Sequence, residues 1–259
     1  MVRIPSPKNE AAEFGSAVHH ALEQLFVRMK ADAHESFPAL DDFLNDFAWY
    51  MKRNRECFTR EQFDRRMEYG LEILKQYYTR HIASFNKMVL IEHNVRSVNV
   101  DGQLLRGKLD KLEFSGRDVT IVDYKTGDPE KCKEKFARPN PRIPHGGDYW
   151  RQAVFYKIML AAYKPEWNVQ AVTFDFVEPN KKKEYQREHV VINEMDLQDV
   201  KTQIRETYEK IQNKEFYTGC GDADCHWCKF VKTNKMAVAL HELKVEEEES
   251  RRSLLRVVE

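Results

Sequence analysis

The sequence lacks the features that mark secreted, fibrous or membrane proteins. Its 259 residues include only 10 glycines and 9 prolines, too few for a collagen-like or disordered chain. No apolar run approaches the roughly 20 residues of a membrane helix, and the charged N-terminal segment does not resemble a signal peptide. The 5 cysteines, an odd number, argue against a disulfide framework. We therefore expect a cytoplasmic protein with no membrane partner.

The charge balance is neutral, because Lys plus Arg and Asp plus Glu each number 42. A compact DNA-binding domain often carries a basic excess, so the balance gives no support to nucleic-acid binding. Basic residues nevertheless gather between 131 and 151. Within this segment Arg138 and Arg142 are candidate contacts for DNA backbone phosphates, with a solvated loop as the alternative.

The order of predicted elements indicates a mixed α/β fold. Three β-rich runs between 88 and 125 are separated by turn-forming sequences, and two more strands follow later in the chain. The loop at 128–147 is too long to be idle, so it is a candidate lid, substrate contact or disordered segment. We expect a central sheet flanked by helices, with a helical N-terminal portion. Helical spacing of apolar residues predicts helices over 10–30, 39–53, 60–86, 148–163 and 196–214.

Two acidic residues face each other in a predicted hairpin whose turn includes Gly116. A two-residue loop pairs Ser115 with Asp118, and a four-residue loop gives the same register. That register places Asp110 opposite Asp123, where Cβ atoms are about 4.5–5.5 Å apart and like charges are destabilising. A divalent cation between the two carboxylates is the economical explanation.

A lysine joins this pair of acids. Because side chains alternate along a strand, Asp123 and Lys125 share one face while Val122 and Tyr124 point the other way. Two acids that hold Mg²⁺ or Mn²⁺, with a lysine near the scissile phosphate, suit phosphodiester hydrolysis. The alternative is an ordinary surface salt bridge between Lys125 and one acid.

The motifs GKLDKLEF and TIVDYKTG resemble those of the RecB-like branch of the PD-(D/E)xK nucleases. Two further segments resemble motifs of this branch. FGSAVHHALEQ is similar to a G-x-x-x-H-x-x-x-E helix, which places His19 and Glu23 one turn apart. WRQAVFYKIML is similar to a Q-x-x-x-Y motif formed by Gln152 and Tyr156. All four stand in the order that the branch has.

The resemblance implies a restriction-endonuclease-like core and assigns roles to particular residues. It implies that Lys125 is catalytic with Asp110 and Asp123, and that Gln152 and Tyr156 contact DNA near the active site. It also implies one nuclease domain over 1–259, with a helical insertion at about 36–86, a core at about 88–217 and a cysteine-containing tail at 218–259. The implied metal ligands are His19, Asp110, Asp123 and the backbone carbonyl of Tyr124.

The function implied by the resemblance is metal-dependent cleavage of DNA, by an exonuclease of repair and recombination. The chain has no G-x-x-x-x-G-K-[ST] loop, so a motor would come from a UvrD-like helicase domain or subunit. One alternative is a catalytically silent nuclease fold that binds DNA or docks a protein. Another is an RNA-directed or CRISPR-type nuclease with the same catalytic set.

A late cysteine cluster has three interpretations. TGCGDADCHWCKF places Cys220, Cys225 and Cys228 in a C-x4-C-x2-C pattern around His226. Some RecB-like nucleases hold a [4Fe–4S] cluster, and three cysteines with one histidine could bind zinc. Reduced thiols that pack a loop are the favoured interpretation, since the spacing departs from the iron–sulfur pattern and short C-x2-C loops rarely wrap so tightly.

Overall fold

The computed structural model describes residues 9–215, Cys225 and Cys228, and it divides into two compact units. The first unit ends at Thr202 and holds every strand among the described residues, together with helices α1 to α4. The second unit begins at Gln203, within helix α5 (Glu194–Gln212). Within the described part of the chain, no helix combines the length and apolarity that crossing a membrane requires.

Three helices form the N-terminal portion: α1 (Glu10–Ala31), α2 (Leu40–Arg53) and α3 (Arg60–His81). α1 begins at Asn9, whose side chain accepts a hydrogen bond from the Ala11 amide, and α3 begins with a capping box at Thr59. Their apolar faces pack on one another in a common core. The third predicted helix was too long, because α3 gives way to a short 3₁₀ turn at Ile82–Ser84.

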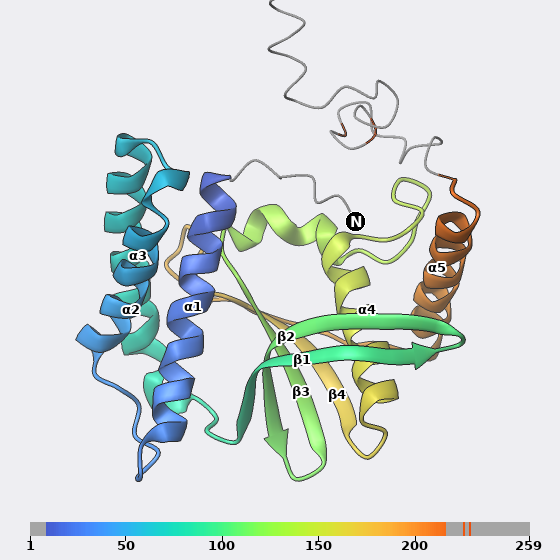
Figure 1. Cartoon of the computed structure of the whole chain (residues 1–259), viewed down its shortest axis with the longest axis horizontal. Coiled ribbons are helices and arrows are strands. Elements are labelled where there is room, and N and C mark those ends of the chain that lie inside the picture. The colour runs from blue at the N-terminus through green and yellow to red at the C-terminus, as the bar shows by residue number, and fades with distance from the viewer. Residues whose placement is uncertain (1–8, 216–224, 226–227, 229–259) are drawn as a thin grey trace, which may run out of the picture. The chain divides into compact units, whose positions relative to one another are not determined.

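One mixed five-stranded sheet forms the centre of the first unit, in the order β1-β2-β3-β4-β5. β1, β2 and β3 are consecutive antiparallel strands, β4 is parallel to β3, and β5 is antiparallel to β4. The crossover from β3 to β4 contains α4 (Asp148–Tyr163). The expected α/β class is confirmed (Figure 1). The strands are β1 (Val89–Val100), β2 (Gln103–Ser115), β3 (Asp118–Lys125), β4 (Asn168–Phe176) and β5 (Arg187–Val190).

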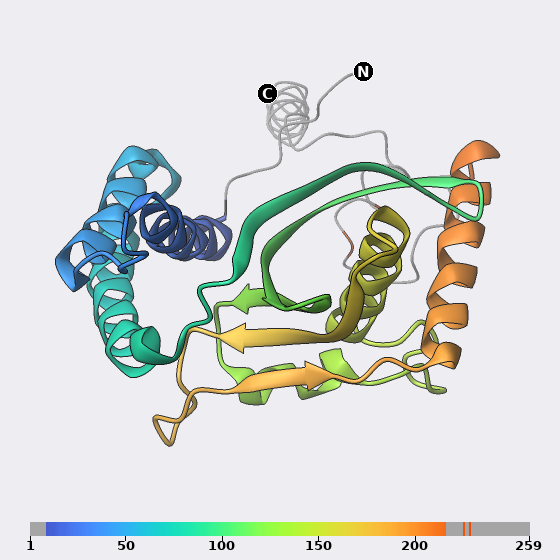
Figure 2. The same cartoon turned by 90° about the horizontal axis from the view of Figure 1, so that it is seen from below.

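Helices cover the two faces of β3 differently. Val122 and Tyr124 belong to the core of α1, α2 and α3, so we call their side the α1 face. Asp123 and Lys125 point to the opposite side, the carboxylate face, where they contact α4. The long β1–β2 hairpin curves over α4 (Figures 1 and 2). Gly107 of β2 lies against α4, where the end of the Met159 side chain is 2.8 Å from the position that a Cβ would take.

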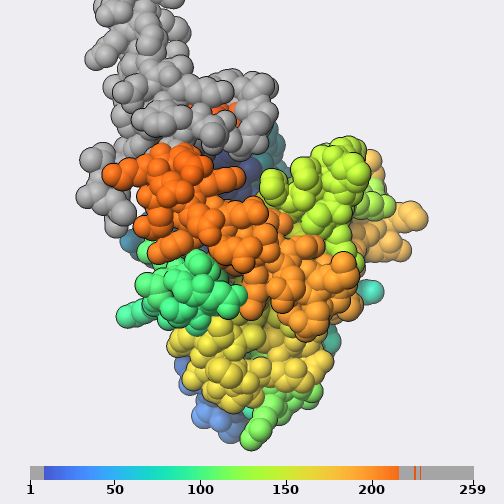
Figure 3. All heavy atoms as spheres, turned by 90° about the vertical axis from the view of Figure 1, so that its right-hand side faces the viewer, coloured from blue at the N-terminus to red at the C-terminus, as the bar shows by residue number. Residues whose placement is uncertain are grey.

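The segment at 128–147 has fixed structure, so the disordered alternative is wrong. Residues Pro129–Phe136 form a 3₁₀ helix. After it, Arg138 makes a bidentate ion pair with Asp196, with N–O distances of 2.7 and 2.9 Å. The β1–β2 turn lies beside the part of α5 that belongs to the first unit, where Lys201 pairs with Asp101 at 3.2 Å (Figure 3).

Candidate active site

The β2–β3 hairpin has the predicted register. Its turn contains Gly116 at φ +64°, and Ser115 pairs with Asp118 across it. The last recorded pair is Lys111 with Val122, so the next step brings Asp110 opposite Asp123. Local turn geometry thus places the two acids on neighbouring strands.

Asp123 is nearly inaccessible and has three polar partners. Its Oδ2 lies 2.7 Å from Lys125 Nζ, while its Oδ1 accepts hydrogen bonds from Gln152 Nε2 and the Tyr156 hydroxyl, each at 3.2 Å. Burial, followed by the charge of Asp110, raises the pKa of Asp123, and the charge of Lys125 opposes this shift. Burial and the neighbouring Asp110 thus outweigh the stabilising effect of the ion pair with Lys125 on the charged form of Asp123.

Lys125 is fixed by the carboxylate, an amide and two aromatic rings. Its Nζ donates to Gln152 Oε1 at 2.9 Å, besides the ion pair with Asp123. The same nitrogen lies 4.6 Å from the ring centre of Tyr149 and 5.2 Å from that of Phe174. These cation–π contacts restrict the ammonium group to the side of Asp123.

Asp110 has partners of its own on the other side. His19 Nδ1 lies 3.3 Å from Asp110 Oδ2, and the same oxygen accepts the Tyr124 backbone N–H at 2.9 Å. Burial opposes the charged imidazole, but the hydrogen bond and charge of Asp110, with the charge of Asp123, raise the pKa of His19. The next residue, His20, lines the same pocket as His19, and its ring packs against Tyr50.

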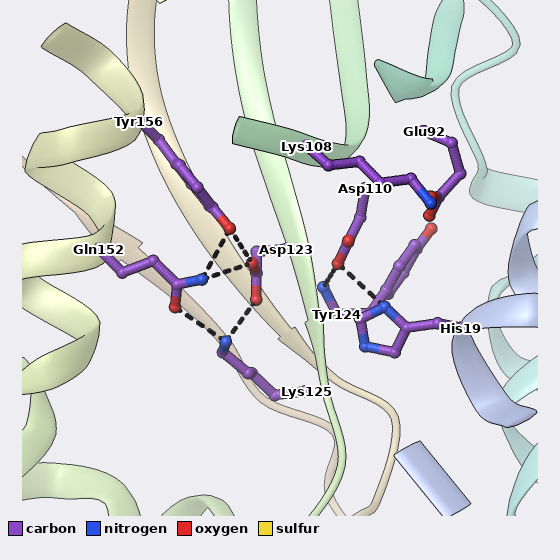
Figure 4. A network of polar contacts seen from close by, with 9 residues as sticks. All are labelled: His19, Glu92, Lys108, Asp110, Asp123, Tyr124, Lys125, Gln152 and Tyr156. Carbon is purple, nitrogen blue, oxygen red and sulfur yellow. Dashed lines mark hydrogen bonds and ion pairs between the residues drawn. The ribbon is translucent and has the colours of Figure 1, made fainter. Parts of the chain in front are cut away.

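The two carboxylates turn in different directions (Figure 4). Asp123 points toward Gln152 and Lys125, and Asp110 points toward His19. For this reason no three His, Cys, Asp or Glu side chains converge as a ligand set among the residues described here. The donor types still fit a hard divalent cation, because two carboxylates and an imidazole lie on neighbouring elements, and the pKa of Asp123 is raised despite its ion pair with Lys125.

A pocket of about 530 Å³ opens beside Asp110 and His19, and Glu92 of β1 lines it. The register before the β1–β2 irregularity, in which Asn94 pairs with Lys108, brings Glu92 opposite Asp110. Glu92 has φ +51°, an uncommon conformation for a side-chain-bearing residue, and forms an ion pair with Lys108.

Glu92 was missed because of a β-bulge. Counting from the Asp101-Gly102 turn, where Val100 pairs with Gln103, would place Glu92 opposite Lys111. The register shift between Val95 and Val98 adds one residue and turns Glu92 to Asp110 instead. The sequence carries no clear signal for that bulge.

The remaining predicted residues lie apart from this arrangement or outside the described residues. Arg138 holds its loop to Asp196, and the exposed Arg142 pairs with Glu134 at 2.6 Å. Their contact with DNA stays a prediction, although the guanidinium of Arg138 already has a structural partner. The cysteine cluster is not tested, since Cys220 and His226 lie outside the described residues.

The comparisons with known proteins agree with this geometry. The model of the PD-(D/E)XK nuclease superfamily matches residues 2–233, so the chain belongs to that superfamily. Its mixed sheet with flanking helices is the restriction-endonuclease-like fold expected from the sequence. The RecB-like branch is suggested only by the motifs.

Two solved structures are similar to this chain. One is a provisionally named exonuclease from Eubacterium rectale, 15% identical, with a TM-score of 0.52 over 90% of this chain and 77% of that one. The other, named SSO0001, is 14% identical over 83% of this chain and 82% of its own, and its TM-score of 0.34 is too low to carry an argument. No curated protein matches the sequence. At these identities the first structure supports the fold alone.

Proposed function

We propose that this member of the nuclease superfamily is a DNA nuclease that depends on Mg²⁺ or Mn²⁺. The observation that carries the proposal is the placement of Asp110 opposite Asp123, with Lys125 held at 2.7 Å from Asp123. Two carboxylates on facing positions of neighbouring strands are mutually destabilising, and the pair has no evident structural purpose here. It suits a site where a cation and a phosphate complete the charge balance.

His19, Asp110, Asp123 and the Tyr124 carbonyl would hold the cation. When bound, a divalent cation polarises the scissile phosphate and lowers the pKa of water. Lys125 is the residue placed to stabilise negative charge that builds on phosphate oxygens. Gln152 contacts Asp123 and Lys125 through its two ends, so it keeps the acid and the base in a fixed relation.

The finer features of the function rest on the motif resemblance. We propose an exonuclease of DNA repair or recombination that works with a UvrD-like helicase domain or subunit. The name of the similar structure from Eubacterium rectale is in line with exonuclease activity. A single nuclease domain, with α2 and α3 as its helical insertion, remains the proposed organisation.

The test is cleavage of linear and circular DNA, single- and double-stranded, with Mg²⁺, Mn²⁺ or EDTA. We expect metal-dependent cleavage that is abolished in Asp123→Ala and Lys125→Ala, with circles spared. Asp118→Ala is a matched control, because this acid lies on the same strand but is exposed and bonds Asn168. Cleavage that survives both substitutions would contradict the proposal. DNA that is bound but never cut would favour the docking-module alternative.

A further inference from the structure

Helix α2 places a row of aromatic side chains beside the catalytic pocket. His20 and Tyr50 line the same pocket as His19 and Asp110. The His20 ring lies 5.2 Å from the Tyr50 ring and 5.5 Å from the Trp49 ring, with interplanar angles of 38° and 32°. We call Trp49, His20 and Tyr50 the aromatic row. It leads from the pocket to the surface of α2.

Trp49 ends the row on the solvent side, where its side chain is 50% exposed. A single exposed aromatic residue needs no explanation by itself. This one is continuous with the pocket through His20, and the guanidinium of Arg53 lies 5.1 Å from its ring centre. The neighbouring Lys52 is also exposed. A half-exposed aromatic ring beside two cations has the chemistry of a nucleotide contact.

We propose that the aromatic row stacks an unpaired base of single-stranded DNA whose backbone enters the catalytic pocket. This inference rests on the proposed nuclease function and names its substrate class. Within a duplex both faces of a base are covered by its neighbours, so only an unpaired base offers a free face to Trp49. Every base has such a face, which makes the contact tolerant of sequence. Arg53 and Lys52 would attract the adjoining phosphates.

The charges around the aromatic row indicate which class of ligand would bind there. The pocket is lined by Asp110 and His19 of the candidate metal site, whereas α2 presents cations at the outer end of the row. A nucleotide strand matches both, since its phosphates suit the cations and a bridging metal, and its bases suit the rings. Duplex DNA could meet the cations but not the ring faces.

The experiment measures binding of a fluorescently labelled oligothymidylate and of a duplex of equal length, without divalent metal. The variants are Trp49→Ala, Trp49→Phe and the control Tyr163→Ala, which removes a half-exposed aromatic residue at the end of α4. We expect Trp49→Ala to weaken single-strand binding about tenfold, in line with the loss of one base–aromatic stack. Duplex binding should not change, and Trp49→Phe should restore most of the affinity.

Unchanged single-strand affinity in Trp49→Ala, or an equal loss for both DNA forms, would overturn the proposal. The Tyr163→Ala control excludes a general effect of removing a surface ring. Because binding is measured without metal, the result does not depend on cleavage. Wild-type protein that binds single strands through Trp49 but never cuts DNA would refute the proposed nuclease function and leave the stacking proposal intact.

Discussion

Both faces of strands β2 and β3 carry acidic and basic side chains, but the two faces differ in how these charges are balanced. On the carboxylate face, Asp110 lines a pocket and Asp123 pairs with the Lys125 ammonium group at 2.7 Å. On the α1 face, Lys111 is fully buried and lies 2.9 Å from Glu113, while Asp175 of β4 pairs with Arg187 of β5 at 3.2 Å. Side chains one residue apart thus serve two separate networks.

Charge balance distinguishes the two networks. The α1 face holds two acids and two bases, and the rings of Phe26, Phe85 and Tyr124 surround the Lys111 ammonium group. Burial lowers the pKa of Lys111 and raises that of Asp175, although their partners oppose both shifts. Desolvation therefore exceeds attraction even in this balanced set. The carboxylate face is unbalanced and open to the pocket, which is the condition for binding a charged ligand.

The largest expected effect is the loss of activity in Asp123→Asn. Cleavage should fall on the order of 10³-fold, about 4 kcal/mol in activation free energy, because the variant loses a charge that the proposed mechanism assigns to metal binding. The free energy of unfolding in EDTA should fall by less than about 1 kcal/mol, since active-site charges often cost stability. Initial rates and urea titrations measure the two quantities. A large loss of stability in Asp123→Asn would show that the carboxylate face stabilises the fold as the α1 face does. The two faces would then not differ in role.

The second expected effect concerns stability and the α1 face. Lys111→Met should lower the free energy of unfolding by about 3 kcal/mol, because it leaves buried acids without one of their two bases. The folded variant should keep its cleavage activity, since Lys111 faces away from the pocket. Urea titration and initial rates again provide the measurement.

Lys108 supplies a matched control on the same strand. Its side chain is 59% exposed and pairs with Glu92, so Lys108→Met should cost less than about 1 kcal/mol of unfolding free energy. Equal losses of unfolding free energy in Lys111→Met and Lys108→Met would show that the burial of Lys111 does not account for its effect on stability. Loss of cleavage in well-folded Lys111→Met protein would show that the two faces are coupled.

The parts of the site that sequence could predict depend on local geometry. The register of Asp110 and Asp123 follows from a short turn, and the spacing of Gln152 and Tyr156 follows from one helical turn. The motif residue His19 indeed contacts Asp110. In each case the interaction is set within one element or one hairpin, or is expected from a motif that resembles those of the RecB-like branch.

The parts that could not be predicted depend on pairing between distant segments. Asp175 joins the Lys111 network only because β4 pairs in parallel with β3, which places it beside Tyr124. Trp49 reaches His20 only because α2 docks on α1. Arg138 pairs with Asp196 across 58 residues of sequence, and its contact with DNA stays a prediction. No local pattern encodes these contacts.

The smallest expected effect tests how α4 serves the carboxylate face. The resemblance assigns Tyr156 to DNA contact, whereas in the structure its hydroxyl bonds Asp123 at 3.2 Å and accepts from Gln152 at 2.7 Å. A hydroxyl that orients the carboxylate acts on the chemical step, so Tyr156→Phe should lower kcat about tenfold, roughly 1.4 kcal/mol, with KM unchanged. Steady-state cleavage of a labelled oligonucleotide measures both constants, and Tyr163→Phe on the same helix is the control. A rise in KM at constant kcat would instead assign the hydroxyl to DNA, because uniform substrate binding affects KM alone.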